Sequence, residues 1–269
     1  MLYLLPIAVI TGLLFGSFFN VLIWRLPRDE SIVWPPSHCT QCGKNIKPWE
    51  NIPVLSFIFL MGKCSTCKTR ISILYPLVEI CTAIFAIVFA LFFIKTMTIP
   101  FSWFTVIPLL IQFIFLLLMI PMTIIDLKHY IIPDQITLPF IITGLAISFL
   151  PGMTSPLSSI AGILVGGGFL YLTGWLGSVV LKKGDAMGGG DIKLMAAAGA
   201  IWGPQVALMA IVIGALLGSL AGIVMIASKK LSSDHRIAFG PFLGAGIWIS
   251  VTAGVQILNY YTMLIDSIH

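Results

Sequence analysis

The sequence predicts an all-α polytopic membrane protein with about eight transmembrane helices and a small cytosolic zinc-binding domain between the first and the second. Two features of composition predict the membrane class. Of the 269 residues 58% are hydrophobic and only 9% are charged, whereas about a quarter of the residues in soluble domains are charged. A pair of CxxC motifs in the one long polar segment predicts the zinc domain.

Eight apolar runs are expected to cross or enter the bilayer, where a full crossing needs about 20 residues. The first run is long enough to span and lacks the basic start of a cleavable signal peptide. The fourth and sixth runs are short for a crossing. The runs cover residues 2–24, 73–94, 103–125, 136–150, 158–181, 192–203, 205–227 and 241–260. We therefore expect three parts, namely a first helix at 1–24, a cytosolic domain at 25–72 and a helix bundle at 73–269.

The distribution of basic residues predicts the orientation. If the N-terminus lies outside and the eight spans alternate, 13 of the 15 lysines and arginines fall in the inner segments. Cytosolic loops carry such an excess of lysine and arginine. The same distribution explains the net charge of +5 without a nucleic-acid partner. The inner segments are then 25–72, 126–135, 182–191 and 228–240.

The inner segment 25–72 contains two cysteine pairs, Cys39 with Cys42 and Cys64 with Cys67. Four thiolates at this spacing suit one tetrahedral Zn²⁺, and four cysteine ligands leave no open position for catalysis, so the zinc would be structural. A segment this short buries little core and gains stability from a metal. The alternatives are two disulfides or free thiols, but a cytosolic location argues against disulfides.

The stretch 182–193 concentrates charge and glycine in an otherwise apolar chain. Three consecutive glycines, from Gly188 to Gly190, allow a close backbone approach and positive φ angles. Asp191 then opens an apolar segment, and an acid is favoured at a helix N-terminus. The stretch is either a flexible solvated loop or a loop that delivers a carboxylate to the membrane edge, which requires a second carboxylate at the same depth.

Asp126 supplies that second carboxylate, because it follows the third span at the same side of the membrane from which Asp191 starts its own. Acids at membrane depth are costly and mark functional sites. Two close carboxylates share a proton, so one acts as base and the other as acid on a water that attacks an amide. The alternative is an interfacial acid paired with Lys128 or Lys193. Two further acids are candidates, Asp134 as a helix cap and Glu79 as a residue that pairs with a base or lines a polar cavity.

These residues together resemble the type IV prepilin leader peptidases, which are membrane aspartic proteases with a GxGD motif. Gly188-Gly189-Gly190-Asp191 matches that motif, and Asp126 with Ile132-Pro133-Asp134 matches its partner. The resemblance covers nearly the whole chain. The other matching segments are Phe15 to Val21, Asn51-Ile52-Pro53 with Ser56, Ile71-Ser72 with Tyr75-Pro76 and Glu79, and Phe239-Gly240-Pro241-Phe242.

The resemblance implies an aspartic endopeptidase in the bacterial inner membrane. It implies that Asp126 and Asp191 are catalytic, that Gly188, Gly190, Asp134 and Glu79 support the motifs, and that type IV prepilins or pseudopilins lose their basic leader at the cytosolic face. Members with the cysteine domain also N-methylate the new N-terminus with S-adenosylmethionine. No dinucleotide-type glycine motif in segment 25–72 indicates where that methyl donor binds.

Two functions of other classes compete with this interpretation. Intramembrane acids and glycine-broken helices also suit an ion-coupled transporter, and a zinc domain also suits a scaffold for pilus assembly. The transporter does not explain the two aspartate motifs together with the cysteine pairs. Hydrolysis of a prepilin separates all three.

Overall fold

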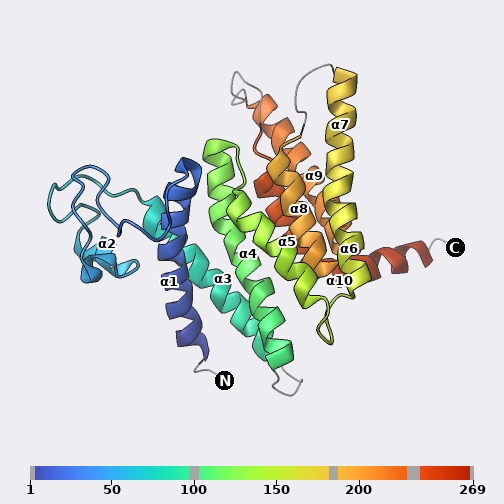
Figure 1. Ribbon diagram of the computed structural model, residues 1–269, viewed down its shortest axis with the longest axis horizontal. Coiled ribbons are helices and arrows are strands. Elements are labelled where there is room, and N and C mark those ends of the chain that lie inside the picture. The colour runs from blue at the N-terminus through green and yellow to red at the C-terminus, as the bar shows by residue number, and fades with distance from the viewer. Residues whose placement is uncertain (1–3, 97–102, 182–186, 229–236, 267–269) are drawn as a thin grey trace. The chain divides into compact units, whose positions relative to one another are not determined.

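The computed structural model describes residues 4–96, 103–181, 187–228 and 237–266, which are mostly helical (Figure 1). These residues form two compact units, Met1–Ser102 and Trp103–His269. The only β-bridges among them are two isolated ones in unit 1. Residues 182–186, the lysine-containing start of the glycine-rich stretch, lie outside the described residues.

Unit 1 consists of two long helices and an irregular segment between them. In its loops, short helices alternate with tight turns, as expected of a segment with too little core for long elements. The elements are α1 (Leu4–Arg25), the 3-10 helices η1 (Leu26–Arg28) and η2 (Pro48–Asn51), the short α2 (Leu55–Phe59) and α3 (Leu74–Thr96).

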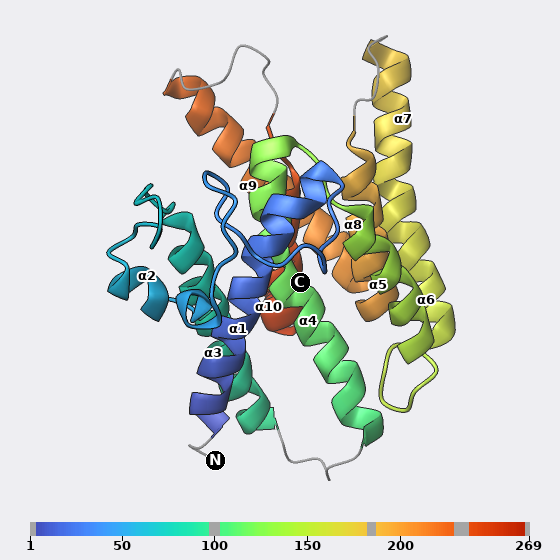
Figure 2. The same ribbon diagram turned by 60° about the vertical axis from the view of Figure 1, so that its left-hand side comes forward.

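Helices α1 and α3 run side by side in both views (Figures 1 and 2). Gly12 and Gly16 lie on the face of α1 that meets α3. A Cβ at Gly16 would lie 2.5 Å from the Cα of Glu79. The absence of a side chain there is what lets the two backbones come so close, as small residues do at helix contacts in membranes.

Unit 2 is a bundle of α-helices arranged around α8. From Leu194 to Ile201 every residue of α8 is buried, and a helix that is apolar on all sides belongs in a bundle interior. Helices α5, α6 and α9 pack against it. The elements are α4 (Trp103–His129), α5 (Asp134–Ile147), α6 (Pro156–Ile163), the π-helical turn η3 (Leu164–Gly168), α7 (Phe169–Leu181), α8 (Gly189–Trp202), α9 (Pro204–Ala227) and α10 (Gly240–Asp266).

The structure supports a membrane protein of several spans. Five segments of the described residues are long and apolar enough to cross a bilayer: Leu5–Arg28, Leu74–Leu91, Val106–His129, Pro156–Val180 and Pro204–Ala227. The predicted runs 136–150 and 192–203 correspond to α5 and α8, each of 14 residues. At 1.5 Å per residue such a helix is about 21 Å long, which is too short for a straight crossing of a core about 30 Å thick. The number eight stays a prediction.

Candidate aspartate pair and zinc site

Asp126 lies in the last turn of α4 and is buried, with 6% of its surface exposed. Its Oδ2 accepts a hydrogen bond of 2.9 Å from the backbone N–H of Gly240, the first residue of α10. This bond joins residues 114 positions apart. The alternative, a pairing of Asp126 with Lys128 or Lys193, is wrong, because the one ion pair among the described residues joins Lys193 to Asp134.

Asp191 lies in the first turn of α8, as predicted for an acid at a helix N-terminus. Its side chain is partly buried. Helix α8 is too short to span a bilayer, and its residues from Leu194 to Ile201 are buried in the bundle. Asp191 therefore lies at the end of an enclosed helix. Burial, and after it the charge of the neighbouring Asp126 carboxylate, raises the pKa of Asp191 to about 7. Asp126 is therefore close enough to Asp191 for its charge to act on the Asp191 carboxyl.

Ile132 lies between the elements that carry the two aspartates. A Cβ at Gly190 would lie 2.8 Å from the Cβ of Ile132, and a Cβ at Gly240 would lie 3.0 Å from its Cδ1. The same added Cβ at Gly240 would lie 2.7 Å from Oδ2 of Asp126. The α4–α5 connection, the start of α8 and the start of α10 thus converge around one isoleucine side chain.

The glycines of the GxGD segment leave room for neighbouring side chains, and their backbone does not adopt positive φ angles. Gly188 is the N-cap of α8 with φ −66°, and the positive-φ glycines of the described chain lie elsewhere, at Gly43, Gly62, Gly152 and Gly203. Of the two properties that three glycines allow, the chain uses the close approach here and not a positive φ. A Cβ at Gly188 would lie 2.9 Å from Oδ2 of Asp191, so the missing side chain leaves room for the carboxylate.

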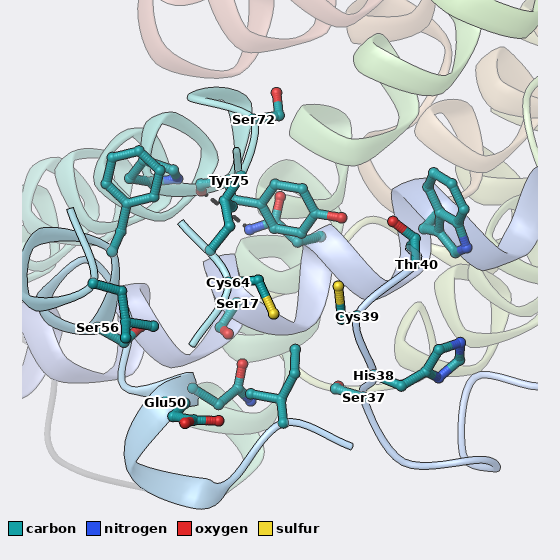
Figure 3. Close-up of a pocket in the computed structure, with 18 of the residues that line it drawn as sticks. Ser17, Ser37, His38, Cys39, Thr40, Glu50, Ser56, Cys64, Ser72 and Tyr75 are labelled. Carbon is teal, nitrogen blue, oxygen red and sulfur yellow. Dashed lines mark hydrogen bonds between the residues drawn. The ribbon is translucent and has the colours of Figure 1, made fainter. Parts of the chain in front are cut away.

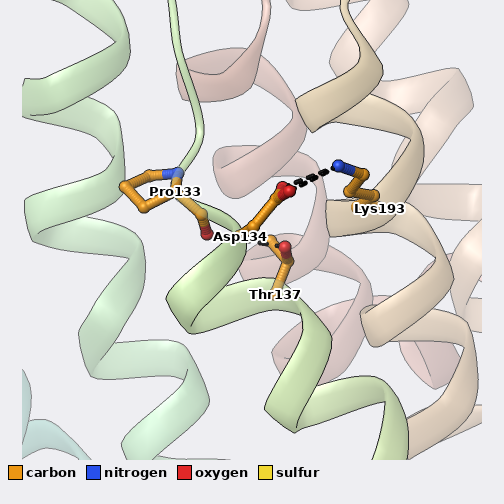
Figure 4. Close-up of polar contacts among 4 residues, drawn as sticks. All are labelled: Pro133, Asp134, Thr137 and Lys193. Carbon is orange, nitrogen blue, oxygen red and sulfur yellow. Dashed lines mark hydrogen bonds and ion pairs between the residues drawn. The ribbon is translucent and has the colours of Figure 1, made fainter. Parts of the chain in front are cut away.

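Asp134 does not cap α5. The N-cap position belongs to Pro133, and Asp134 occupies the first turn. Its two carboxylate oxygens accept hydrogen bonds of 2.8 and 2.7 Å from Nζ of Lys193 (Figure 4). The expectation of a cap is wrong because the lysine of α8 engages the side chain instead. This bond ties the start of α5 to α8 two residues after Asp191.

Glu79 lies in unit 1, where it is 7% exposed and lines a cavity, as one of the two expectations for it required. It accepts a 2.7 Å hydrogen bond from the backbone N–H of Val54. Val54 has φ +61°, which is rare for a β-branched residue. Glu79 thus fixes a turn of the polar segment to the helix α3.

The four cysteines of the CxxC pairs form one cluster, with all sulfur atoms within 4.8 Å of one another. The sulfurs of Cys39 and Cys67 are 3.8 Å apart. Tetrahedral zinc with Zn–S bonds of about 2.3 Å places its sulfurs roughly 3.8 Å apart. None of the four cysteines forms a disulfide, so the alternative of disulfides receives no support.

The two cysteine pairs have the same local fold, which explains why the four sulfurs converge. Cys39 N–H donates to Lys44 and Cys64 N–H donates to Thr69, and each first cysteine accepts a bond from the residue four positions later. That residue is left-handed in both turns, with φ +69° at Gly43 and +56° at Lys68. The sulfur of Cys67 also lies 3.3 Å from the Thr69 hydroxyl oxygen. The donor set and its spacing fit zinc.

Sequence reasoning did not single out Gly240 as a partner of Asp126, nor Lys193 as a partner of Asp134. The signal for Gly240 was present in the matched segment Phe239-Gly240-Pro241-Phe242. A backbone donor leaves no mark in residue type, so its target could not be found without the fold. Ile132 was quoted only as part of a motif.

Comparison with known proteins finds two family models and a set of relatives that match the chain. Residues 10–93 match the Bacterial Peptidase A24 N-terminal domain, and residues 113–223 match the Type IV leader peptidase family. Curated proteins named prepilin leader peptidase/N-methyltransferase are similar to it. That of Pseudomonas putida is 34% identical over 95% of this chain and 92% of its own, and that of Neisseria gonorrhoeae is 34% identical over 93% and 91%. No solved structure matches the chain.

Proposed function

Because the chain belongs to the type IV leader peptidase family, we propose that it cleaves the basic leader from type IV prepilins or pseudopilins and N-methylates the new N-terminus. The proteins that it resembles are named for both activities. The single observation that carries the proposal is the approach of Asp126 and Asp191, which lie 65 positions apart, around Ile132.

The proposed cleavage uses the two carboxylates as a pair that holds one proton. The ionised member takes a proton from water, whose oxygen attacks the scissile carbonyl carbon, and the protonated member gives its proton to the tetrahedral intermediate. The C–N bond then breaks as the leaving amine takes the proton that the first carboxylate removed from water. The hydroxyl of the intermediate returns its proton to the second carboxylate as the C=O bond re-forms, so the pair again holds one proton. The Gly240 N–H on Oδ2 of Asp126 holds one side of this pair in position. Gly188, Gly190, Asp134 and Lys193 act as positioning residues.

The proposed location is the bacterial inner membrane, with the N-terminus outside and the active site at the cytosolic face. The excess of lysine and arginine in the segments assigned to the inside supports this orientation. A four-cysteine zinc site stabilises segment 25–72, and S-adenosylmethionine supplies the methyl group. Prepilins and membrane lipid are the expected partners, and no nucleic acid is needed.

The experiment mixes the full chain, purified in detergent, with a candidate prepilin and follows the size of the pilin on a gel. We expect the leader to be removed. A transporter or a scaffold would leave the prepilin intact. An unchanged prepilin in the presence of a protein with the expected zinc content and helicity would refute the proposal.

A further inference from the structure

Unit 1 contains a cavity of about 360 Å³ between α1, the two cysteine turns and the start of α3 (Figure 3). This volume is in the range of small-molecule sites. The zinc-site residues Cys39 and Cys64 form part of its wall. The cavity is therefore large enough for a cofactor, and its shape depends on the cysteine cluster.

Two oppositely charged side chains lie buried in the wall of this cavity. Arg25, at the end of α1, is 5% exposed, and Glu79, in α3, is 7% exposed. Arg25 donates to the carbonyls of Ser31 and Pro35, and Glu79 accepts from Val54. Among the described residues the one ion pair is that of Lys193 with Asp134, so Arg25 and Glu79 do not pair with each other.

A buried charge without an opposite charge is costly. Arg25 and Glu79 face one cavity with opposite charges and form no ion pair with each other. They are therefore complementary to a ligand that carries both a negative and a positive charge. Arginine has five N–H donors, and two bonds to carbonyls leave donors for a carboxylate. The pair thus predicts a zwitterionic ligand.

The remaining wall suits a ligand with a flat aromatic part. Trp24 and Tyr75 line the cavity and are each 38% exposed. The side chain of Asn20 donates to the carbonyl of Tyr75 at 3.1 Å and fixes that residue against α1. Aromatic faces stack with a base.

We propose that this cavity binds the methyl donor, with Arg25 holding its α-carboxylate and Glu79 its α-ammonium group. The inference rests on the proposed methyltransferase function. S-adenosylmethionine combines an amino-acid zwitterion with an adenine, so it presents the charges and the flat ring that the wall accommodates. Arg25 and Glu79 act here in binding, apart from the aspartate pair of unit 2.

The direct test needs no variant. Binding of S-adenosylmethionine and of decarboxylated S-adenosylmethionine to the zinc-loaded full chain in detergent is measured by isothermal titration calorimetry without pilin. The two ligands differ in the carboxylate alone. Loss of a buried, charge-assisted contact predicts binding weaker by about 30-fold or more for the decarboxylated ligand.

Variants then assign the contact to Arg25. Arg25→Gln should bind S-adenosylmethionine about 30-fold or more weakly but should change the affinity for the decarboxylated ligand little. Glu79→Gln keeps an acceptor for Val54 N–H and should also weaken binding. Glu30→Gln is the matched control, because Glu30 is exposed and lies outside the cavity wall. Zinc content is measured for every variant.

Three results would overturn the inference. One is equal affinity of the wild-type protein for the two ligands. Another is an equal fall in affinity for both ligands in Arg25→Gln with zinc retained, which would indicate a structural role for Arg25. In either case, methyl transfer by the wild-type protein would leave the proposed function standing. A wild-type protein that neither binds S-adenosylmethionine nor transfers its methyl group would instead refute the proposed methyl donor itself.

Discussion

The two units hold their polar groups by different means. In unit 1, four cysteines organise short loops, and two turns with the same hydrogen bonds bring the sulfurs within 4.8 Å of one another. In unit 2, the carboxylates lie at helix ends, whose close packing depends on missing side chains at Gly190 and Gly240. Removal of a metal should therefore disturb the first arrangement, and addition of a single methyl group should disturb the second.

Loss of either carboxylate should have the largest effect on unit 2. Asp126→Asn and Asp191→Asn keep the shape but remove the shared proton, so prepilin cleavage should fall by roughly 10³-fold or more. Asp29→Asn in unit 1 is the control, since Asp29 is exposed. The measurement is the initial rate of leader removal. Normal cleavage by either dyad variant at normal membrane level would exclude the aspartate pair.

Loss of a zinc ligand should have the largest effect on unit 1. Purified protein should contain about one zinc per chain. Cys42→Ser or Cys67→Ser should release the metal, make segment 25–72 sensitive to protease and abolish methyl transfer before cleavage declines. Cys81→Ser is the matched control, because Cys81 lies outside the cluster. Metal analysis and limited proteolysis test this, and wild-type protein without metal would rule out the zinc site.

Added methyl groups should sharpen the contrast by affecting unit 2 in a position-dependent way. Gly190→Ala would place Cβ 2.8 Å from Ile132, and Gly240→Ala would place it 2.7 Å from Asp126 Oδ2. Displacement of a reacting group by about 1 Å costs on the order of 100-fold, so cleavage should fall 10- to 100-fold. Gly189→Ala is a control within the same motif, since its Cβ would meet nothing within 4 Å. An equal fall in cleavage rate in all three variants would mean that the glycines are needed for backbone freedom and not for the space left by the missing side chains.

The pH dependence should be the smallest effect and should have opposite signs for the two activities. The pKa of Asp191 is raised to about 7, so the pair holds its proton below that pH and loses it above. Cleavage should fall by up to about tenfold per pH unit above 7. Methyl transfer should rise over the same range, because a free α-amine has a pKa of about 8 and reacts when neutral. Rates at pH 6–9 for each substrate test this, and cleavage that rises with pH would contradict it.

The class, the cysteine cluster and the acid at the start of α8 could be predicted because each depends on local residue type and spacing. Four cysteines in two CxxC pairs leave few geometries, and a charge in an apolar chain is conspicuous. The number of spans could not be predicted, since α5 and α8 are apolar but short. The Asp134–Lys193 bond and the Gly240 donor could not be predicted either, because they join residues 59 and 114 positions apart and depend on how the helices pack.

We propose that cleavage and methylation are separate chemistries of the two units. The decisive experiment follows transfer of a labelled methyl group from S-adenosylmethionine to a pilin supplied already trimmed, with Asp191→Asn as the enzyme. We expect methyl transfer close to the wild-type rate by a protein that no longer cleaves prepilin. Loss of both activities in an Asp191→Asn protein with normal zinc content and helicity would contradict it, because the two activities would then share a site.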